Sequence, residues 1–497
     1  MRITIVGAGY TGSTLATELA TSHDTDLDVC LVGTPGNFGG GVAYGDARGE
    51  HLLNARAGHL GATADKPAGF ARWLNLSERA RDAFLPRVAY GEYLLDRLHE
   101  AEVASTNLTS LENEVIEIDR VHGKGYRVHL DDGSSFMSDR VVLAVGTLPP
   151  QRLPGVGPRL ARHSRYIASP WQEGDLDRID RDAELLIVGT GLTMVDIVAT
   201  LNRRGHRGRI VALSRHGLLP QRHTEAPADP VELPPNLRKA LRESDLHALV
   251  SAVRSVTRVV DDWRVVIDAI RPEIQACWRG MSQTQRGRFL RHVRAYWESH
   301  RHRMPPKAAA EIDDAIASGQ LRIVSGRLLR AGITDTGLSA LIRPRGSVDA
   351  ERHDFDMLIR ATGMDTDITR TTHPLIQHLV AAGTLQPDPL GLGVRVSPHF
   401  EVLDADGQPV SGLYCVGALA RGDCWELTAI NELRSATWGL SRRLRAAAGL
   451  AARDDDAGND GHGTGDGSAH GDDSDLPTPR GMAPAARTGS TVWPSVR

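Results

Sequence analysis

Cysteine is scarce in this sequence, with four among 497 residues: Cys30, Cys277, Cys415 and Cys424. No two of them stand in a Cys-x-x-Cys spacing, so the common sequence patterns for zinc sites and redox-active dithiols are absent. Scattered cysteines in a chain of this length do not suggest a disulfide framework. We therefore expect buried, reduced thiols, no metal site, and no cysteine pair that accepts electrons.

Long hydrophobic runs and an excess of charge of one sign are also missing. No apolar run reaches the roughly 18 residues that a membrane-spanning helix requires. The net charge of -4 and the pI near 6.6 give no basic surface for nucleic acid or anionic lipid. An apolar strand, Arg2–Val6, occupies the place where a signal peptide would begin. We expect a cytoplasmic protein that binds neither nucleic acid nor membranes.

The composition that is present is typical of a large globular protein. Hydrophobic residues make up 41% and charged residues 24% of the chain, and the length predicts about three folding units. We place a first unit at 1–150, a second at 151–355 with a helix-rich insertion at about 230–318, and the remainder of the first unit at 356–450. Residues 451–497 are dominated by Asp, Gly, Ser, His and Pro, which predicts a disordered acidic tail.

Two stretches of the chain share the order strand, glycine turn, helix, strand. One begins at Arg2–Val6 and the other at Leu185–Val188. Short alternating runs between residues 115 and 130, before the buried strand Val141–Val145, indicate a small antiparallel meander inside a parallel sheet. The sequence therefore predicts an α/β fold with two Rossmann-like dinucleotide-binding domains and a helical insertion.

The first glycine turn is Gly7-Ala8-Gly9-Tyr10-Thr11-Gly12. In such a turn Gly7 permits the tight bend, Gly9 lets the backbone approach a pyrophosphate, and Gly12 lets helix and strand pack closely. The helix N-terminus near Thr11 offers unpaired N–H groups and a partial positive charge to the phosphates. The motif alone is a weak signal, but its position between a strand and a helix favours a dinucleotide site.

One feature of the usual fingerprint is missing. The second strand of such a unit commonly ends in an acidic residue that binds the adenosine ribose. Here it ends Leu31-Val32-Gly33-Thr34, without a carboxylate. Thr34, a water molecule, or a residue from elsewhere in the chain must take that role.

The second glycine turn is Gly189-Thr190-Gly191-Leu192-Thr193-Met194, with Met194 in place of the third glycine. The following strand ends in Ser214-Arg215-His216. At this place an acidic residue would favour NADH, whereas a hydroxyl and an arginine suit the 2′-phosphate of NADPH. Arg215 is also compatible with an ordinary solvated arginine, so we expect NADPH and keep NADH as an alternative.

Two such turns in one chain indicate two dinucleotides, and FAD exchanging a hydride with NAD(P)H is the favoured explanation. Val141–Gly146 and Met357–Gly363 are apolar strands ending in small-residue turns, as in the segments that join the domains of two-dinucleotide flavoproteins. Leu413–Gly417 is similar to their final FAD-binding strand, and the helix beginning near Thr428 would face the flavin pyrimidine. Each segment alone is also compatible with an ordinary sheet strand.

Several further motifs together resemble the FAD/NAD(P)-binding protein family of bacterial flavoproteins. They are Gly39–Tyr44, Glu50–Asn54, Phe70–Leu74, Pro86–Tyr93, Gly189–Thr193, Tyr296–Arg303 and Cys424–Ala429. The resemblance extends from residue 1 to about 445 and is specific for the family but not for a substrate. It implies NAD(P)H-dependent flavin monooxygenases as relatives, among them a urate hydroxylase and an aspartate N-oxygenase.

The arginine-rich part of the insertion has helical spacing. An apolar face is predicted for Phe289, Val293, Tyr296, Trp297 and His300, and it is best explained as core. Four arginines lie off that face: Arg291, Arg294, Arg301 and Arg303. They are either a solvated or salt-bridged surface, or a clamp for a carboxylate or another anion.

These observations lead to a hypothesis about the reaction. NAD(P)H would reduce FAD, and O2 would then supply one oxygen atom to a small polar anionic substrate. An aspartate-like amine is favoured because its carboxylates use several arginines, and a urate-type purine comes second. Arg301 is the candidate substrate contact, while His51 and Asn54 are candidates for lining the flavin. Structural hydrogen bonding within their loop is an equal alternative for His51 and Asn54.

Two other functions remain open at this level. The chain would be an electron-transfer reductase if it delivered electrons to a protein partner. It would be a redox-sensing flavoprotein if it bound partners through its acidic tail. A buried pocket lined by arginines favours the monooxygenase, whereas an exposed flavin edge beside a charged surface favours the reductase.

Overall fold

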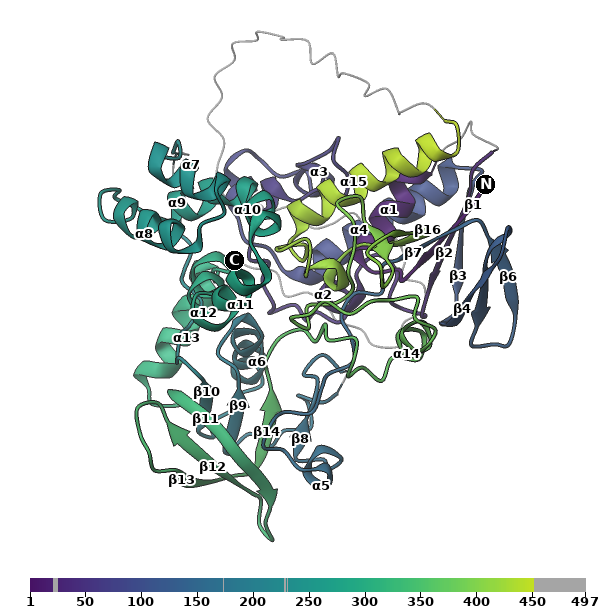
Figure 1. Cartoon of the computed structure of the whole chain (residues 1–497). Coiled ribbons are helices and arrows are strands. Elements are labelled where there is room, and N and C mark those ends of the chain that lie inside the picture. Colours follow the sequence, from purple (N-terminus) through teal and green to yellow (C-terminus); the bar gives the residue numbers. More distant parts are fainter. Residues whose placement is uncertain (21–25, 173, 228, 230, 451–497) are drawn as a thin grey trace.

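The computed structural model describes residues 1–497 apart from 21–25, 173, 228, 230 and 451–497. The predicted acidic tail therefore lies outside the described residues. Figure 1 shows one sheet with its helices at the upper right, a second sheet at the bottom, and a group of short helices at the upper left. We call these the first body, the second body and the helical insertion.

The first body is built on a six-stranded sheet with the order β15-β16-β7-β1-β2-β3, which is parallel except at the β15 edge. Val6 pairs with Val32 and with Leu143, so the carboxyl ends of the three central strands meet at one edge. These strands are almost wholly buried, as expected for parallel strands covered on both faces. The strands are β1 (Arg2–Val6), β2 (Asp28–Gly33), β3 (Leu108–Glu112), β7 (Arg140–Leu143), β15 (Glu401–Leu403) and β16 (Pro409–Cys415).

Residues from both ends of the chain complete this body. Leu413 on β16 pairs with Val141 on β7, so the C-terminal part adds strands to the sheet that starts at Arg2. Helix α1 contacts both α4 and α15. The predicted meander is present as a separate three-stranded sheet. The elements are α1 (Tyr10–Leu19), α4 (Arg87–Ala104), α14 (Pro374–Ala381), α15 (Ile430–Ala447), β4 (Val115–Val121), β5 (Gly125–Leu130) and β6 (Ser135–Ser138).

The second body contains a seven-stranded sheet with the order β13-β12-β11-β10-β9-β14-β8. Its strands are β8 (Tyr166–Ile167), β9 (Leu185–Val188), β10 (Ile210–Ser214), β11 (Leu321–Ile333), β12 (Leu338–Pro344), β13 (Glu351–Phe355) and β14 (Met357–Arg360), with α6 (Leu192–Arg203) and α13 (Pro306–Ala317) packed on them. Met357 pairs with Leu185, so β14 belongs to this sheet. The predicted boundary at residue 356 therefore falls too early, because the chain returns to the first body only after β14. Each sheet has a parallel centre, with antiparallel strands at one edge, and the two together confirm the predicted fold class.

The helical insertion lies between β10 and α13 in sequence but packs on the first body. Its core includes Trp278, Phe289 and, from the first body, Trp425. Trp278 stacks on Trp425 with ring centroids 4.7 Å apart, and its indole N–H donates to the carbonyl of Gly422 at 2.8 Å. The helices are α7 (Pro235–Arg242), α8 (Leu246–Val256), α9 (Trp263–Ile270), α10 (Ile274–Gly280), α11 (Gln283–His292) and α12 (Arg294–Arg301).

The arginine-rich segment differs from its prediction as one continuous helix. Helix α11 ends at His292 and α12 begins at Arg294. Phe289 is in the core and Trp297 packs against it, whereas Tyr296 is 44% exposed. The predicted apolar face is wrong at Tyr296, because the helical repeat does not continue through the break.

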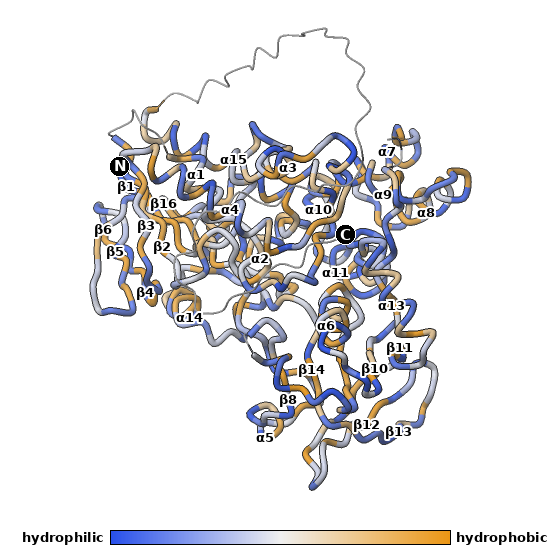
Figure 2. Tube along the Cα trace, turned by 180° about the vertical axis from the view of Figure 1, so that it is seen from behind, coloured by the Kyte–Doolittle hydropathy of each residue, from blue (hydrophilic) through white to orange (hydrophobic). Residues whose placement is uncertain are grey.

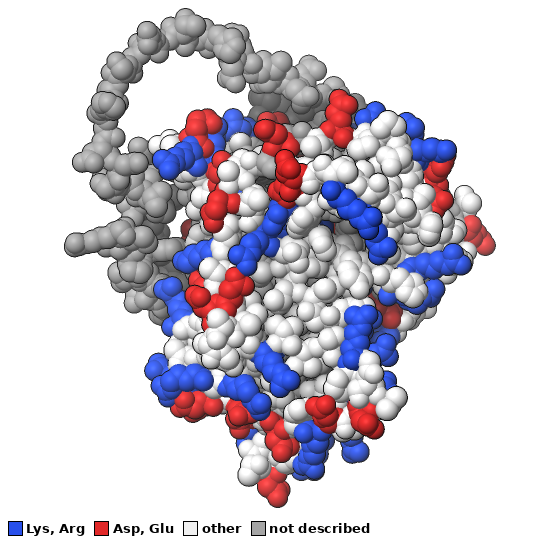
Figure 3. Space-filling view, turned by 90° about the vertical axis from the view of Figure 1, so that its left-hand side faces the viewer, with Lys and Arg blue, Asp and Glu red and all other residues white. Residues whose placement is uncertain are grey.

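Hydrophobic residues are concentrated in the two sheets, and charged residues lie mostly on the surface. Figure 2 shows hydrophobic residues concentrated along the strands of both sheets. On the face shown in Figure 3, basic and acidic side chains alternate without a continuous patch of one sign. Among the described residues, no helix is long and apolar enough to cross a membrane, and no three His, Cys, Asp or Glu side chains are grouped to hold a metal ion.

Candidate functional site

A cavity of about 630 Å³ opens at the carboxyl ends of the first sheet and extends to the second body. We call it the cofactor cleft. This edge of a parallel α/β sheet is the usual place for a dinucleotide. Segments far apart in sequence meet there, and the lining includes Gly7, Gly9, Thr11, Thr34, Gly146, Thr193, Ala361, Ala418, Leu427 and Thr428.

The first glycine turn fits a pyrophosphate. A Cβ added at Gly9 would make only ordinary contacts, the nearest being Gly41 Cα at 3.5 Å, whereas a Cβ at Gly12 would lie 1.8 Å from the carbonyl oxygen of Gly7. Gly12 therefore permits α1 to pack on β1, and Gly9 leaves the cleft open. Within the described residues no side chain caps α1, so its first N–H groups face the cleft without a side-chain partner.

A carboxylate from another part of the chain lines the cleft, although none follows β2. Thr34 and Asn37 line the cleft, with Asn37 Nδ2 donating to Thr34 Oγ1 at 2.5 Å. Glu114, from the connection after β3, lines the same cleft. Sequence reasoning misses Glu114 because only the pairing of β3 with β2 brings it there.

The C-terminal segments predicted to contact FAD also reach the cleft. Gly146 follows β7 and lines it directly. Gly417, in the turn after β16, approaches the first glycine turn, since a Cβ added there would lie 3.3 Å from Thr11 Oγ1. Thr428 lines the cleft just before α15, which has no side-chain cap in the described part of the chain. The uncapped N-terminus of α15 thus suits the pyrimidine side of a flavin.

The second glycine turn also makes a close approach. A Cβ at Gly189 would lie 2.0 Å from the carbonyl oxygen of Ala361, whereas Gly191 has open space beside it. Helix α6 likewise lacks a side-chain cap within the described residues. Thr193 lines the cofactor cleft, while Leu192 points into a second cleft described below.

Basic side chains surround the end of β10. Thr190 Oγ1 lies 2.9 Å from Ser214 Oγ, which also accepts a backbone N–H at 3.0 Å, so both hydroxyls help to shape the loop. Arg215 is exposed, and Arg345 from the turn after β12 donates to His216 Nδ1 at 3.0 Å. Burial, followed by Arg345 and Arg215, lowers the pKa of His216. Two guanidinium groups beside a neutral imidazole fit a 2′-phosphate, and Arg345 is the contact that sequence reasoning misses.

Three arginines and two glutamates form a charged cluster between the helical insertion and the segment before α15. This arginine cluster consists of Arg271, Arg301, Arg421, Glu426 and Glu432. Arg301 Nε lies 3.3 Å from Glu426 Oε2, and its Nη2 lies 3.7 Å from Glu432 Oε1. Arg271 Nη2 donates to Glu432 Oε2 at 2.7 Å. Burial lowers the pKa of Arg301 and lowers that of Arg421 to about 10. Among these five residues positive charge is in excess by one.

The four arginines predicted as one clamp are separated in the structure. Arg291 is exposed, and Arg294 Nε donates to Glu298 Oε1 at 2.7 Å. Arg303 pairs with Asp268. Of the four, only Arg301 belongs to the arginine cluster. The others point elsewhere because the helix is broken between α11 and α12 and ends after Arg301.

His51 does not itself line the cofactor cleft, although its ring meets Trp171, which does, with ring centroids 5.7 Å apart. It is 2% exposed, and its Nδ1 accepts the backbone N–H of Arg48 at 3.1 Å, so Nε2 carries the proton and donates to Thr200 Oγ1 at 2.9 Å. Thr200 in turn donates to Glu50 Oε1 at 2.9 Å. Burial lowers the pKa of His51 to about 4. The imidazole therefore joins the first body to α6, one residue behind the lining of the cofactor cleft.

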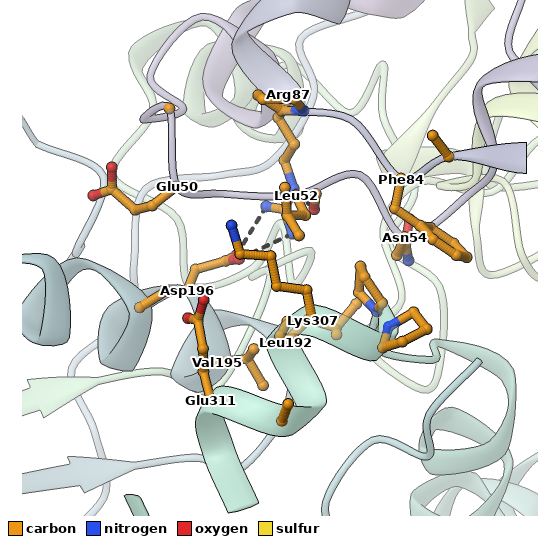
Figure 4. Close-up of a pocket in the computed structure, with 18 of the residues that line it drawn as sticks. Glu50, Leu52, Asn54, Phe84, Arg87, Leu192, Val195, Asp196, Lys307 and Glu311 are labelled. Carbon is orange, nitrogen blue, oxygen red and sulfur yellow. Dashed lines mark hydrogen bonds and ion pairs between the residues drawn. The ribbon is translucent and has the colours of Figure 1, made fainter. Parts of the chain in front are cut away.

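Asn54 has a similar position between the bodies. Its backbone carbonyl accepts from His223 Nε2 at 3.0 Å, and the residue lines a second cavity of about 1250 Å³. We call this cavity the α6 cleft, since one face of α6 forms a wall of it. Figure 4 shows Asn54 on one side of it, with Lys307 and Glu311 projecting from α13.

Arg87 lies between the two clefts and lines both. Its Nη1 is 2.8 Å from Asp196 Oδ2, and its Nε donates to the carbonyl of Leu52 at 3.0 Å (Figure 4). Burial raises the pKa of Asp196 to about 6, although Arg87 opposes that shift. The Arg87–Asp196 ion pair thus closes the cofactor cleft on this side and ties α4 to α6.

All four cysteines are buried and free of disulfide bonds. Spacing in the sequence does not reveal that Cys415 and Cys424 are neighbours, as the influence of Cys424 on the pKa of Cys415 shows. Burial raises the pKa of Cys415 to about 12 and also raises that of Cys424. Both are therefore thiols at neutral pH and poor candidates for electron transfer.

Two family models match the chain where the cleft is built. Residues 4–148 match the FAD-NAD(P)-binding model, and residues 316–437 match an FAD binding domain. The chain is an FAD- and NAD(P)-binding flavoprotein. The predicted family and the predicted cofactor class are thereby confirmed. No curated protein matches the flavoprotein in sequence.

Solved structures share the fold at low sequence identity. An ornithine hydroxylase from Pseudomonas aeruginosa and the ornithine N-hydroxylase of Kutzneria sp. 744, the latter with reduced FAD, NADP+ and L-ornithine, each match with a TM-score of 0.61 and 15% identity. They cover 90% of this chain and 98% and 99% of their own. L-Lysine 6-monooxygenase from Pseudomonas syringae matches with a TM-score of 0.60 and 16% identity over 90% of this chain and 99% of its own.

Proposed function

We propose that the flavoprotein is an NADPH-dependent monooxygenase that transfers one oxygen atom from O2 to a small carboxylate-bearing substrate. N-oxygenation of an aspartate-like amine is the favoured reaction, and hydroxylation of a urate-type purine comes second. The observation that carries this proposal is the arginine cluster, whose Glu426 immediately precedes two residues that line the cofactor cleft. The structures named as an ornithine hydroxylase, an ornithine N-hydroxylase and an L-lysine 6-monooxygenase support the reaction type through the shared fold.

The charge of the cluster favours an anionic substrate. Arg271, Arg301 and Arg421 share Glu426 and Glu432. The other carboxylates that act on them, Asp268 and Glu298, already pair with Arg303 and Arg294, so one guanidinium of the group lacks a carboxylate of its own. Guanidinium groups bind carboxylates through two parallel N–H donors, and burial strengthens such pairs. An aspartate-like amine presents carboxylates that can pair bidentately with guanidinium groups, whereas a urate-type monoanion spreads its charge over a ring.

The protein's own residues then have distinct tasks. FAD, when bound, accepts hydride from NADPH and activates O2. The first glycine turn and α1 hold its pyrophosphate, and Arg215 with Arg345 holds the 2′-phosphate of NADPH. Arg301 orients the substrate carboxylate, and the closely packed surroundings of the cluster exclude water.

Isotope-labelled O2 tests the proposal. The FAD-loaded protein is supplied with NADPH, labelled oxygen gas and L-aspartate, with uric acid, L-ornithine and L-lysine as comparison substrates. We expect label in the product from L-aspartate and little from the two amino acids with cationic side chains, measured by mass spectrometry beside NADPH and oxygen consumption. The reductase function replaces this one if NADPH is consumed only after a carrier protein is added and no substrate acquires label.

A further inference from the structure

Glu426 has an unusual backbone for its residue type. Its φ of 69° places a non-glycine residue in the left-handed region, although its side chain is buried with 4% exposed. Its carbonyl accepts the N–H groups of Thr428 at 2.6 Å and Ala429 at 3.1 Å, which forms the tight turn before α15. Leu427 and Thr428, next in the chain, line the cofactor cleft. Such strain persists only where the surroundings hold it, and here the side chain is the obvious anchor.

One carboxylate oxygen of Glu426 is well held and the other is not. Oε1 accepts the indole N–H of Trp297 at 2.7 Å. Oε2 lies 3.3 Å from Arg301 Nε, yet neither atom makes a hydrogen bond within the described part of the chain. Arg301 Nη2 is also buried without a hydrogen bond, 3.7 Å from Glu432 Oε1. The two glutamates therefore balance the charge of Arg301, but its Nε and Nη2 atoms form no hydrogen bonds with them.

A buried guanidinium with unsatisfied N–H groups favours a carboxylate that lies close enough to accept hydrogen bonds from them. Charge-assisted hydrogen bonds from arginine form at about 2.7–2.9 Å, and a bidentate carboxylate would satisfy two N–H groups that Glu426 leaves unsatisfied. Arg421 adds positive charge nearby, and its Nε also lacks a hydrogen bond within the described residues. A second carboxylate can therefore enter without a net excess of negative charge.

We propose that Glu426 occupies, in the ligand-free protein, the place on Arg301 that a small carboxylate ligand takes, and that its displacement moves the turn beside the cofactor cleft. Glu426 is a positioning residue in this scheme, since it acts on the flavin side only through Leu427 and Thr428. The turn is held less firmly once Oε2 loses Arg301, because the Trp297 hydrogen bond and the backbone hydrogen bonds of the turn then hold the left-handed conformation without that ion pair. The inference rests on the proposed function, which supplies the carboxylate ligand.

The test uses succinate, a dicarboxylate that has no amine to oxygenate. Full-length FAD-loaded protein is titrated with succinate while the flavin absorbance spectrum and the thermal unfolding midpoint are recorded. Wild type is expected to show a flavin difference spectrum. Glu426→Gln keeps the acceptor for Trp297 but removes the competing charge, so succinate should bind it about tenfold more tightly, stabilise it more strongly, and alter the flavin spectrum less.

Glu243→Gln is the matched control, because Glu243 pairs with Lys239 in the same helical insertion and is 57% exposed. Its succinate affinity should stay within about twofold of wild type, which is the range for exposed ion pairs. Trp297→Phe loosens the same anchor without removing a charge, and it should also tighten succinate binding. It serves in place of Glu426→Gln if that variant does not fold.

Equal or weaker succinate binding in Glu426→Gln, or in Trp297→Phe where it is the substitute, would overturn the inference. So would a wild-type flavin spectrum that does not respond to succinate. These outcomes are separate from the labelled-oxygen experiment. If succinate exchanges with Glu426 but no substrate acquires label, the proposed function fails and the exchange stands.

Discussion

Gly9 and Gly12 belong to the same turn but meet different neighbours. A Cβ at Gly9 would have its nearest contact at 3.5 Å, whereas a Cβ at Gly12 would be 1.8 Å from a backbone oxygen. The first position therefore constrains what enters the cleft, and the second constrains how the chain folds. The sequence motif identifies both glycines. Only the atoms around each glycine show whether replacing it affects cofactor binding or folding.

Replacing these glycines should separate cofactor loss from loss of fold. We expect Gly9→Val to remain folded but to purify without its yellow colour, because the side chain fills the space for the pyrophosphate. Gly12→Ala should lower the free energy of unfolding by about 2 kcal/mol, as overpacking commonly does. Absorbance at the flavin bands and denaturant unfolding measure the two effects. Full FAD content in folded Gly9→Val would contradict the placement of FAD at this turn.

Arg215 and Arg345 should set the preference for NADPH. Removing either guanidinium takes away a charge-assisted contact to the 2′-phosphate, so Arg215→Ala and Arg345→Ala should each raise the KM for NADPH about threefold to tenfold. The KM for NADH, which has no such phosphate, serves as the internal control and should stay unchanged. Stopped-flow reduction of the flavin gives both values. An unaltered ratio in both variants would show that other residues bind the phosphate.

At the level of elements, the loop before α3 (Gly69–Trp73) attaches the first body to α6. Residues of this loop contact α6 through the chain of hydrogen bonds from His51 to Thr200 and on to Glu50. Arg87, at the start of α4, adds the ion pair to Asp196. The motif that contains His51 and Asn54 is therefore better explained by holding the two dinucleotide sites in one orientation than by chemistry at the flavin.

The His51 contact should make stability depend on pH in a defined direction. The pKa of His51 is about 4 in the folded protein and near its ordinary value of 6.5 in the unfolded chain, so the unfolded chain binds more protons. Stability from the neutral imidazole is thus present above pH 6.5 and lost as the pH falls toward 4. Between pH 7 and pH 5 we expect a loss of about 2 kcal/mol.

His51→Gln removes the titrating group but keeps a hydrogen-bond donor for Thr200. Its free energy of unfolding should fall less between pH 7 and pH 5 than that of wild type, as measured by denaturant unfolding at both values. Other titrating groups cancel in this comparison, including Asp196, whose raised pKa of about 6 acts in the opposite direction. Parallel pH profiles for the two proteins would contradict the buried, neutral imidazole.

At the level of the whole molecule, sequence alone determined the features that depend on local pattern. Two strand–turn–helix units predicted two dinucleotide domains, and the return of the chain to the first sheet followed from the apolar segments near residues 141 and 413. These predictions succeeded because glycine spacing and hydrophobic periodicity act within a few residues. The glycine turns also indicate the cofactor class, because the pyrophosphate of a dinucleotide binds to the backbone of a single turn.

Tertiary structure alone decided which distant side chains meet. Glu114 reaches the cofactor cleft through strand pairing, Arg345 reaches His216 across 129 positions, and Trp425 joins the helical insertion to the first body. Arg301 and Arg303 are two residues apart, yet one meets Glu426 and the other Asp268. No periodicity encodes such partners, because burial and charge pairing are settled only when the two sheets and the helical insertion pack together.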